Sequence, residues 1–563
     1  MPDSPQSALQ RKLTDINRLA EERDALRRAE RTGYPYIDIR KIPISTEAIK
    51  LIPELDARDA KASAIEIKLR EVAVAALDPQ SPGTQKIIQD LEARKYAVKL
   101  FVVSLSGLNE AWHFYKFVSA TTKDITGKVE IEKQRFEGLL QKLTTFKMVN
   151  DELSAVDFNK LSTTNLFEII LAGALSNRAS DIHFEAEEKS ARVRYRLDGL
   201  LHDIYNALPA HSYNSLLSRI KLLSGLKINV YGEAQDGRFT IDLPTKEVEM
   251  RVSIVPSEFG ETIVMRVLDP DSIHVKLEEL GMRPDIFNLA KKELSKPNGL
   301  ILNTGPTGSG KTTTLYAFLE SILSTELKII TIEDPIEYRV AGIEQTQVHA
   351  DAGYTFASGL RALMRQDPDV ILVGEIRDHE TADIALQASL TGHLVLSTLH
   401  ANDAVASIPR LVNLNIPPET IGPSLTLIIA QRLVRIFCKS CRKEAAMDDA
   451  LKAHIEKMLS NLPPQVDRTP YKNYKLYEPV GCNDCNGLGY KGRRAIFEFL
   501  EVTPEMQELI LKETSEMAIR NIARKQGWMP FQEDGILKAL TGFTSLKEVE
   551  DITGPIEWDR LSR

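Results

Sequence analysis

The sequence predicts an α/β protein whose core is an open sheet built around a phosphate-binding loop. Apolar residues 300–302 run into a glycine-rich loop and then into a helical stretch at 313–322. The β-branched stretch 328–332 and the apolar stretch 370–373 each run into acidic residues. Acids just past the carboxyl end of a strand lie where an open α/β sheet places its binding site. These stretches therefore predict both the fold class and the place of the site.

The glycine-rich loop satisfies the P-loop pattern through Gly305, Gly310, Lys311 and Thr312. Its glycines let successive backbone N–H groups turn toward one anion, the lysine reaches the β- and γ-phosphates, and the threonine hydroxyl ligates Mg²⁺. An ordinary glycine-rich turn is the alternative, and the strand–loop–helix context argues against it. The predicted site for a nucleoside triphosphate is the whole loop, which comprises Gly305, Pro306, Thr307, Gly308, Ser309, Gly310, Lys311, Thr312 and Thr313.

Candidate catalytic acids follow the next two core strands. The first of these strands runs into Glu333 and Asp334, with Glu337 shortly beyond. At the end of the second, Gly374 stands where a Walker B motif normally has aspartate, and Glu375 comes next. A glutamate there can orient or deprotonate the attacking water, or bind Mg²⁺ through water.

Two histidines flank the last predicted core strand, residues 394–399. His400 follows the strand, where a histidine could sense the γ-phosphate, and His393 precedes it. For either residue taken alone, a structural histidine is the favoured interpretation.

Two arginines are predicted to face each other across a hairpin. The stretches 248–255 and 262–268 read as strands, and a turn centred between residues 258 and 259 places Arg251 opposite Arg266. Two like charges directly opposite each other destabilise a ladder, and an anion between them would explain the arrangement. A slip of one residue in the register would remove this reasoning. The stretch 192–197 also alternates basic and apolar residues. A strand with one solvated face explains this pattern as well as a functional role does.

Three further arginines, Arg361, Arg365 and Arg377, surround the turn at 367–369. The first two lie four residues apart and so share one helix face. Cations beside a nucleotide fit either arginine fingers or a salt-bridged subunit interface, and the sequence leaves both open.

All four cysteines fall in two CxxC pairs, Cys438 with Cys441 and Cys482 with Cys485, separated by 40 residues. This arrangement predicts a structural Cys₄ zinc site, since four thiolates leave no open coordination position. A redox pair is the alternative. The separation exceeds the 15–20 residues of compact zinc ribbons, so we expect a long helical excursion between the pairs.

The bulk properties narrow the class of protein. The net charge of −8 argues mildly against a general nucleic-acid binder. The N-terminus MPDSPQSALQ lacks an apolar signal core, and no apolar run approaches the ~18 residues of a membrane span. We therefore expect a cytoplasmic protein with peripheral membrane association only.

The N-terminal third carries no catalytic constellation. We expect a solvated or partner-binding helix at 5–31, a strand at Tyr36–Ile39, helices at 46–51 and 84–96, and a strand-like run at 65–76. The expected domains are an N-terminal helix (1–33), a small α/β domain (34–120), a helical linker (121–160), a second α/β domain that contributes arginines (161–275), and an ATPase domain (276–563) with the cysteine insertion (438–485) and C-terminal helices.

Taken together, the motifs resemble those of the type II/type IV secretion ATPases. The resemblance covers about residues 160–560 and is carried by GPTGSGKTTTLYAFL, TIEDPIEY, LRALMRQDPDVILVGEIRD, TGHLVLSTLHAND, SDIHFE, RYRLDG, QDGRF and GCNDCNGLGYKGR. It implies a RecA-like P-loop core preceded by a PAS-like α/β domain. It also implies ATP hydrolysis by a homo-hexameric ring, with each nucleotide between these two domains.

The resemblance also implies roles for single residues. Gly305 to Thr313 match the Walker A box, and Gly374-Glu375 match an atypical Walker B. Arg251 and Arg266 match residues that reach the phosphates, and Arg361, Arg365 and Arg377 match nucleotide-proximal or interface arginines. Glu333, Asp334 and Glu337 match the Asp box, and His393 and His400 match the His box. The cysteine pairs indicate the secretion and pilus-extension branches of the family.

The segment YIDIRKIPISTEAIKLIPE resembles the start of the family's N-terminal docking domain, which implies an inner-membrane platform or adaptor protein as the partner. Repeated Arg-Leu-Gly motifs are absent, so cyclic di-GMP is not expected, and residues 1–33 lie outside the resemblance.

The predicted function is an ATPase that powers type II secretion or type IV pilus assembly from the inner face of a bacterial membrane. Glu375 is the expected water-activating residue, with Glu333 as the competitor. A P-loop nucleic-acid translocase and a non-hydrolysing, nucleotide-dependent scaffold are the alternatives.

Overall fold

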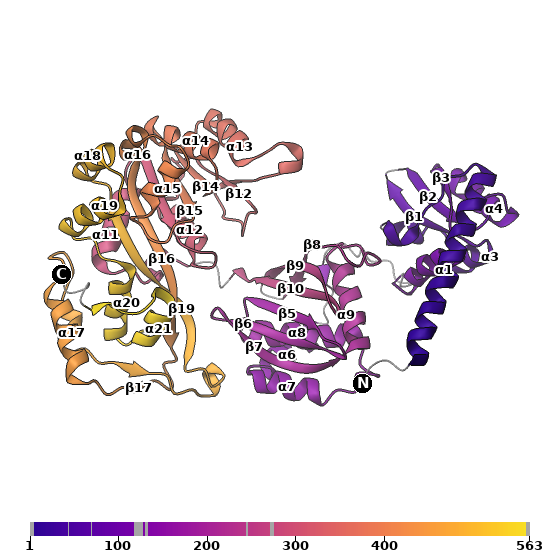
Figure 1. Ribbon diagram of the computed structural model, residues 1–563, viewed down its shortest axis with the longest axis horizontal. Coiled ribbons are helices and arrows are strands. Elements are labelled where there is room, and N and C mark those ends of the chain that lie inside the picture. The colour runs from indigo at the N-terminus through magenta and orange to yellow at the C-terminus, as the bar shows by residue number, and fades with distance from the viewer. Residues whose placement is uncertain are drawn as a thin grey trace.

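Three α/β bodies follow one another along the chain in the computed structural model (Figure 1). The structure describes residues 5–42, 44–68, 70–117, 128–129, 133–243, 246–270 and 275–558. The N-terminal body lies at one end, the second body in the middle, and the C-terminal body at the other end. None of the helices in these described ranges is long and apolar enough to cross a membrane. The predicted mixed α/β class is confirmed.

The N-terminal body has a three-stranded sheet in the order β1-β2-β3. Its helices and strands are α1 (Pro5–Thr32), α2 (Thr46–Ile49), α3 (Glu54–Asp59), β1 (Ala62–Lys68), β2 (Glu71–Ala76), α4 (Pro82–Ala93), β3 (Ala97–Val102) and α5 (Leu105–His113). The predicted strand at Tyr36–Ile39 is wrong. Tyr36 makes only an isolated bridge to Val102, and Asp38 caps a short 3₁₀ helix at Ile39–Lys41.

Helix α1 forms where the sequence predicts it, but its second half is not a separate solvated helix. Ala25 and Ala29 pack against Val102. The Glu22 carboxylate accepts hydrogen bonds from the Tyr36 hydroxyl at 2.6 Å and the Ser104 hydroxyl at 2.9 Å. These contacts make the second half of α1 part of the N-terminal body.

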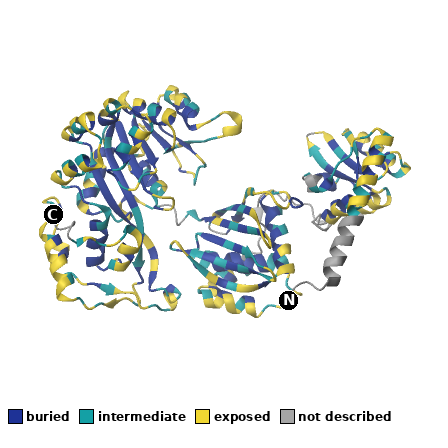
Figure 2. Ribbon diagram, viewed as in Figure 1, coloured by how far each residue is buried: buried dark blue, intermediate teal, exposed yellow. Residues whose placement is uncertain are grey.

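The second body is a seven-stranded sheet in the order β4-β8-β9-β10-β5-β6-β7. Helices pack on the sheet, and their buried residues form one apolar core with those of the strands (Figure 2). Its elements are β4 (Lys128–Val129), α6 (Lys133–Lys142), α7 (Phe146–Ser154), α8 (Thr163–Ser176), β5 (Asp181–Ala186), β6 (Ser190–Leu197), β7 (Leu200–Pro209), α9 (Ala210–Leu223), β8 (Gln235–Asp242), β9 (Glu247–Ser257) and β10 (Gly260–Leu268).

The predicted linker at 121–160 is helical, but its helices belong to the core of the second body. Phe136, Leu139 and Leu143 from α6 and the turn after it are buried in that core, together with Val149 and Leu153 from α7. Apolar side chains at helical spacing need a surface to cover, and the sheet supplies it. Residues 121–127 and 130–132 of this prediction lie outside the described part of the chain.

The predicted hairpin of the second body is confirmed. Arg251 pairs with Arg266 between β9 and β10, which is the register expected from the sequence. Strand β6 alternates buried residues with half-buried arginines. Those arginines pair with neighbouring acids, for example Arg194 with Asp203 at 3.0 Å, so the solvated-face interpretation holds for this strand.

The C-terminal body is organised on a sheet in the order β13-β12-β14-β15-β11-β16-β19, parallel except for the last strand. Leu300 and Leu302 face one apolar core, while Ile301 between them faces the other. Such strands are apolar on both sides because helices cover both faces. The strands are β11 (Gly299–Thr304), β12 (Ile329–Glu333), β13 (Glu344–Gln347), β14 (Val370–Ile376), β15 (Leu394–Leu399), β16 (Leu425–Phe437) and β19 (Tyr490–Glu501).

One face of this sheet is covered by α11 (Pro284–Leu294) and α12 (Lys311–Ile322). The other face is covered by α13 (Phe356–Leu363), α14 (His379–Leu390), α15 (Ser407–Asn413), α16 (Pro418–Ser424), α18 (Pro504–Lys512) and α19 (Glu516–Lys525). Helices α20 (Phe531–Leu540) and α21 (Leu546–Thr553) form a further core with α17 (Asp449–Ser460), the one long helix between the cysteine pairs. The short strands β17 (Lys443–Glu444) and β18 (Tyr477–Glu478) complete that excursion.

Candidate active site and metal centre

The main cleft lies at the carboxyl edge of the parallel strands, against the end of β10 from the second body. It encloses about 460 Å³, which is within the range of small-ligand pockets. Its walls include Lys311 and Thr312 of the P-loop, Glu375 near the carboxyl end of β14, and Arg266 of the second body. The cleft therefore lies where an open α/β sheet places its ligand.

The P-loop conformation requires glycine at two of its positions. Gly305 and Gly310 have φ angles of 150° and 87°, which other residues rarely adopt. A Cβ atom at Gly305 would lie 2.7 Å from the Gln431 carbonyl oxygen, and one at Gly310 would lie 2.8 Å from Gln431 Nε2. Lys311 Nζ donates to the Gly305 carbonyl at 2.8 Å, and burial lowers the pKa of this amine.

Gln431, which belongs to no sequence motif, supports the P-loop through hydrogen bonds from β16. This side chain in β16 is 1% exposed. Its Nε2 donates to the Ser309 carbonyl at 2.9 Å, and its Oε1 accepts from Thr314 Oγ1 at 2.8 Å and from Asn303 Nδ2 at 3.2 Å. A buried amide must satisfy its hydrogen bonds, and here the partners are the loop and its two flanking elements. The signal in the sequence was a glutamine inside the apolar run LTLIIAQRL.

Glu333 lines the cleft but is held in a buried network. It is 3% exposed, accepts from Thr331 Oγ1 at 2.6 Å, and accepts a short hydrogen bond from the Tyr316 hydroxyl. Gln345 Nε2 adds a longer bond at 3.4 Å. Burial raises the pKa of Glu333, although these donors act in the opposite direction. Both carboxylate oxygens therefore accept hydrogen bonds that join α12, β12 and β13.

Glu375 is placed differently. It lies near the carboxyl end of β14 and lines the cleft together with His400 and Arg377. Its Oε2 is 3.5 Å from His400 Nε2, and its other oxygen forms a close ion pair with Arg377. The His400 side chain is 50% exposed and the Glu375 side chain is 15% exposed, so both are more accessible than Glu333.

The two hairpin arginines reach the cleft region, and each has a carboxylate partner. Arg251 Nη1 donates to Glu337 at 2.9 Å, and its Nη2 donates to the Ile336 carbonyl at 2.6 Å. Arg266 Nε donates to Asp181 on the adjacent strand at 3.1 Å. These acids offset the repulsion between the arginines, so the like-charge pair does not by itself require an anion. Arg266 nevertheless lines the cleft.

His393, Arg361 and Arg365 were predicted as site residues, but they do not line the cleft of this chain. His393 precedes β15 and so stands at the opposite edge of the sheet from His400, with its Nδ1 3.0 Å from the Ala388 carbonyl. Arg361 pairs with Glu380 at 2.5 Å, and Arg365 donates to the Arg361 carbonyl at 2.9 Å. The whole length of β15 separates His393 from His400.

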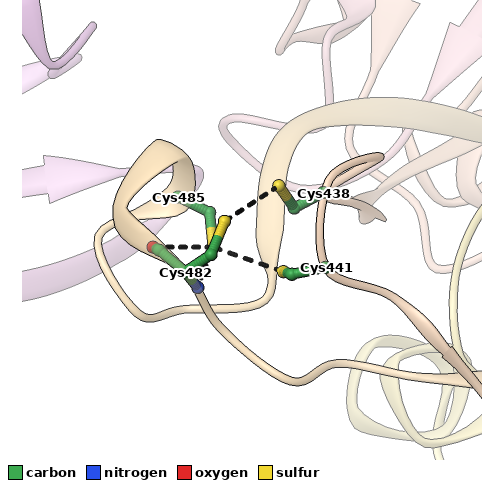
Figure 3. A group of neighbouring side chains, drawn as sticks. All are labelled: Cys438, Cys441, Cys482 and Cys485. Atoms are coloured by element: carbon green, nitrogen blue, oxygen red, sulfur yellow. Dashed lines mark hydrogen bonds between the residues drawn. The ribbon is translucent and has the colours of Figure 1, made fainter.

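The four cysteines meet because β16 and β19 are antiparallel neighbours. Phe437, just before the first pair, lies opposite Tyr490, just after the second pair. The four sulfurs lie within 4.8 Å of one another, and three of the S–S separations are 3.8 Å (Figure 3). A tetrahedron with Zn–S bonds of about 2.3 Å has edges of about 3.8 Å. The donor set and the spacing therefore fit a tetrahedral zinc ion.

Comparison with known proteins agrees with this geometry. Residues 159–551 match the family model described as type II/IV secretion system protein. The chain belongs to this family. Its members among the relatives below are ATPases, and the chain is an ATPase of this kind.

Relatives from both branches of the family are similar to the chain. The type IV pilus assembly ATPase PilB of Myxococcus xanthus is 37% identical over 529 residues, which cover 93% of this chain and 89% of the relative. The type II secretion system protein E of Aeromonas hydrophila is 43% identical over 389 residues, which cover 69% and 75%. The solved ATPase DotB of Yersinia pseudotuberculosis superposes with a TM-score of 0.52 at 20% identity, over 72% of this chain and 95% of that chain, and supports the fold alone.

Proposed function

We propose that the chain is the subunit of a homo-hexameric motor that couples ATP hydrolysis to type IV pilus assembly or type II secretion. The position of Arg266 carries this proposal. This arginine belongs to the second body, yet it lines the same cleft as the P-loop, so a cation from outside the core lies beside the phosphate-binding residues. Alignment across 93% of the chain with a pilus assembly ATPase, N-terminal body included, favours the pilus branch.

In this proposal the P-loop amides and Lys311 bind the phosphates, and Thr312 holds Mg²⁺. When bound, Mg²⁺ neutralises charge that develops on the transferred phosphoryl group. Arg266 and Arg377 both line the cleft and add positive charge there, and release of Arg251 from Glu337 would free a third cation. Arg361 and Arg365 are exposed on α13 and the turn after it, where they fit an interface with a neighbouring subunit.

Glu375 is the proposed water-positioning residue. It faces the cleft with His400 beside it, whereas both oxygens of Glu333 accept internal hydrogen bonds. A general base must reach the proton it removes, and this requirement favours Glu375, whose partners Arg377 and His400 also line the cleft, over the buried Glu333. The Asp334 carboxylate lies 3.9 Å from the Arg377 guanidinium and helps to hold it in place.

The ATP proposal is tested with the purified full chain. We expect steady-state phosphate release from ATP with Mg²⁺, and in sedimentation a species of about six times 63.0 kDa when nucleotide is present. Absence of phosphate release from such rings would support the non-hydrolysing scaffold. Strong stimulation by DNA that disappears as salt rises would support a nucleic-acid translocase.

The proposed location is the inner face of the bacterial membrane, with the N-terminal bodies docked on a platform or adaptor protein. The alignment with the pilus assembly ATPase extends through these bodies, which supports a shared role for them. Cross-linking in cells through residues 1–120 of the full chain should recover an inner-membrane protein. The identity of that protein would show which machine the ATPase serves.

The Cys₄ cluster is proposed to hold one structural zinc ion. Elemental analysis should find one zinc per chain, and Cys482→Ser should lower both this content and the melting temperature. The reason is that removing one of four ligands weakens a site that joins the ends of β16 and β19. Ser440→Ala, on a neighbouring exposed position that pairs with Asp484, is the control and should retain the metal. Zinc-free protein with an unchanged melting temperature would contradict this assignment.

A further inference from the structure

Among the described residues, hydrogen bonds join the second body to the C-terminal body at two separate places. One is the cleft, where Arg251 contacts Ile336 and Glu337. The other is the second cysteine pair and the start of β19, which meet the α7 and β6–β7 end of the second body. We propose that the second cysteine knuckle, residues 482–489, is the docking surface that sets the position of the second body, with Asn486 as the positioning residue. This inference rests on the proposed function of that body in the ATP site.

Asn486 makes two hydrogen bonds across this contact. Its Oδ1 accepts from the Phe146 backbone N–H at 2.8 Å, at the first residue of α7. Its Nδ2 donates to Asn177 Oδ1 at 3.0 Å. Asn177 is 7% exposed and is anchored in the second body, because its Nδ2 donates to the Leu143 carbonyl at 3.0 Å and the Gly173 carbonyl at 2.8 Å. One amide therefore joins the knuckle to a helix N-terminus and to the end of α8.

One neighbouring hydrogen bond supports the same surface. The Gly492 backbone N–H at the start of β19 donates to Asp198 Oδ2 in the β6–β7 turn at 2.8 Å. The Phe146 ring lies 5.3 Å from the His202 ring of β7, which continues the contact within the second body. The residues involved come from three separate elements of the second body, so the surface is more than a single chance contact.

The knuckle geometry determines where the Asn486 side chain points. Asn486 directly follows Cys485 and has a φ of 54°, a left-handed conformation that asparagine tolerates better than most residues. The Gly487 N–H closes the turn on the Cys482 carbonyl at 2.8 Å, and the N–H groups of Cys482 and Gly489 each donate to Cys485 Sγ at 3.2 Å. A metal ion on the four thiolates would hold this turn, and through it the amide of Asn486.

Attachment at two places has a mechanical consequence. With the knuckle contact intact, Arg266 and Arg251 are held over the cleft at one angle. Without it, the second body can rotate about the cleft contact, and displacement of a catalytic cation by about 1 Å is enough to lower a rate by about two orders of magnitude. The metal centre would thus act on hydrolysis from a distance, by fixing the arginines and not by touching the nucleotide.

The test uses Asn486→Gly in the full chain. Glycine keeps the left-handed turn and removes only the amide, so the zinc content should not change. Asn415→Gly is the matched control, because Asn415 has a φ of 62° and is exposed in the loop between α15 and α16. Asp198→Gly is a second disrupting variant at a position with a φ of 48°. We expect kcat for ATP to fall about tenfold in both disrupting variants and to stay at the wild-type level in the control.

Hydrogen exchange of the nucleotide-free protein separates docking from catalysis. In Asn486→Gly the amides of Phe146 and Gly492 should both exchange faster, although Asp198, the acceptor for Gly492, is unchanged. Treatment of the wild type with a zinc chelator should give the same pattern. If only Phe146 loses protection while Gly492 and kcat are unchanged, the proposal is wrong. If the wild type hydrolyses no ATP, the proposed function fails, yet the exchange pattern still decides whether the knuckle docks the second body.

Discussion

Lys311→Ala should abolish steady-state ATP hydrolysis, with a fall in kcat/KM of at least about a hundredfold. The amine lies in the cleft on the loop carbonyls of Gly305 and Pro306, at 2.8 and 3.1 Å, from where it can turn onto phosphate oxygens. Phosphate release is the measurement. Nucleotide affinity, followed with a fluorescent ATP analogue, should also fall, because the lysine contributes to ground-state binding.

The folded state should tolerate this change. Lys311 contacts only carbonyls of its own loop, and burial lowers its pKa, so its charge is a cost to the fold that alanine removes. The melting temperature should therefore be equal to or above that of the wild type. Lys328→Ala, at the position just before β12 and outside the cleft lining, is the control and should keep its turnover. Normal turnover in Lys311→Ala would refute the assignment of the site.

Glu375→Gln should lower kcat by about 10² to 10⁴ while leaving ATP binding nearly unchanged. Glutamine keeps the size of the side chain but cannot accept a proton from water. Single-turnover hydrolysis and equilibrium binding, measured separately, distinguish the loss of chemistry from the loss of affinity. The variant should therefore accumulate as an ATP-bound ring.

Glu333→Gln provides the comparison that decides between the two candidate bases. Because Glu333 accepts from Thr331 and from the Tyr316 hydroxyl in a buried site, its substitution should mainly lower the melting temperature. The effect on kcat should be the smaller of the two. A stable Glu333→Gln variant without hydrolysis, beside an active Glu375→Gln variant, would reverse the assignment.

Several features of this protein follow from residues close together in the chain. The P-loop glycines and Lys311 form one local turn whose conformation their own residue types dictate. The pairing of Arg251 with Arg266 was also predictable, because a short turn sets the register of a hairpin. The acids after β12 and β14 were placed at one edge of the sheet by the common direction of its parallel strands.

The structure changed other expectations because they depended on partners distant in sequence. Helices α6 and α7 read as a linker from composition, yet their apolar faces belong to the core of the second body. The sequence made Glu333 a candidate catalytic acid. Only the packing of α12 and β13 shows that its carboxylate accepts hydrogen bonds from Tyr316 and Gln345. Gln431 carried no motif, although it holds the P-loop.

The sequence by itself determined that this chain folds as an α/β protein with a P-loop, a row of acids at one sheet edge, a hairpin of arginines and four paired cysteines. Each of these follows from backbone preference or strand direction over a few residues. Only the tertiary structure decided that Arg251 meets Glu337, that His393 and His400 stand at opposite edges, and that Asn486 reaches Asn177. Such contacts form because buried charges and amides require partners, and the fold supplies those partners from segments that no local pattern connects.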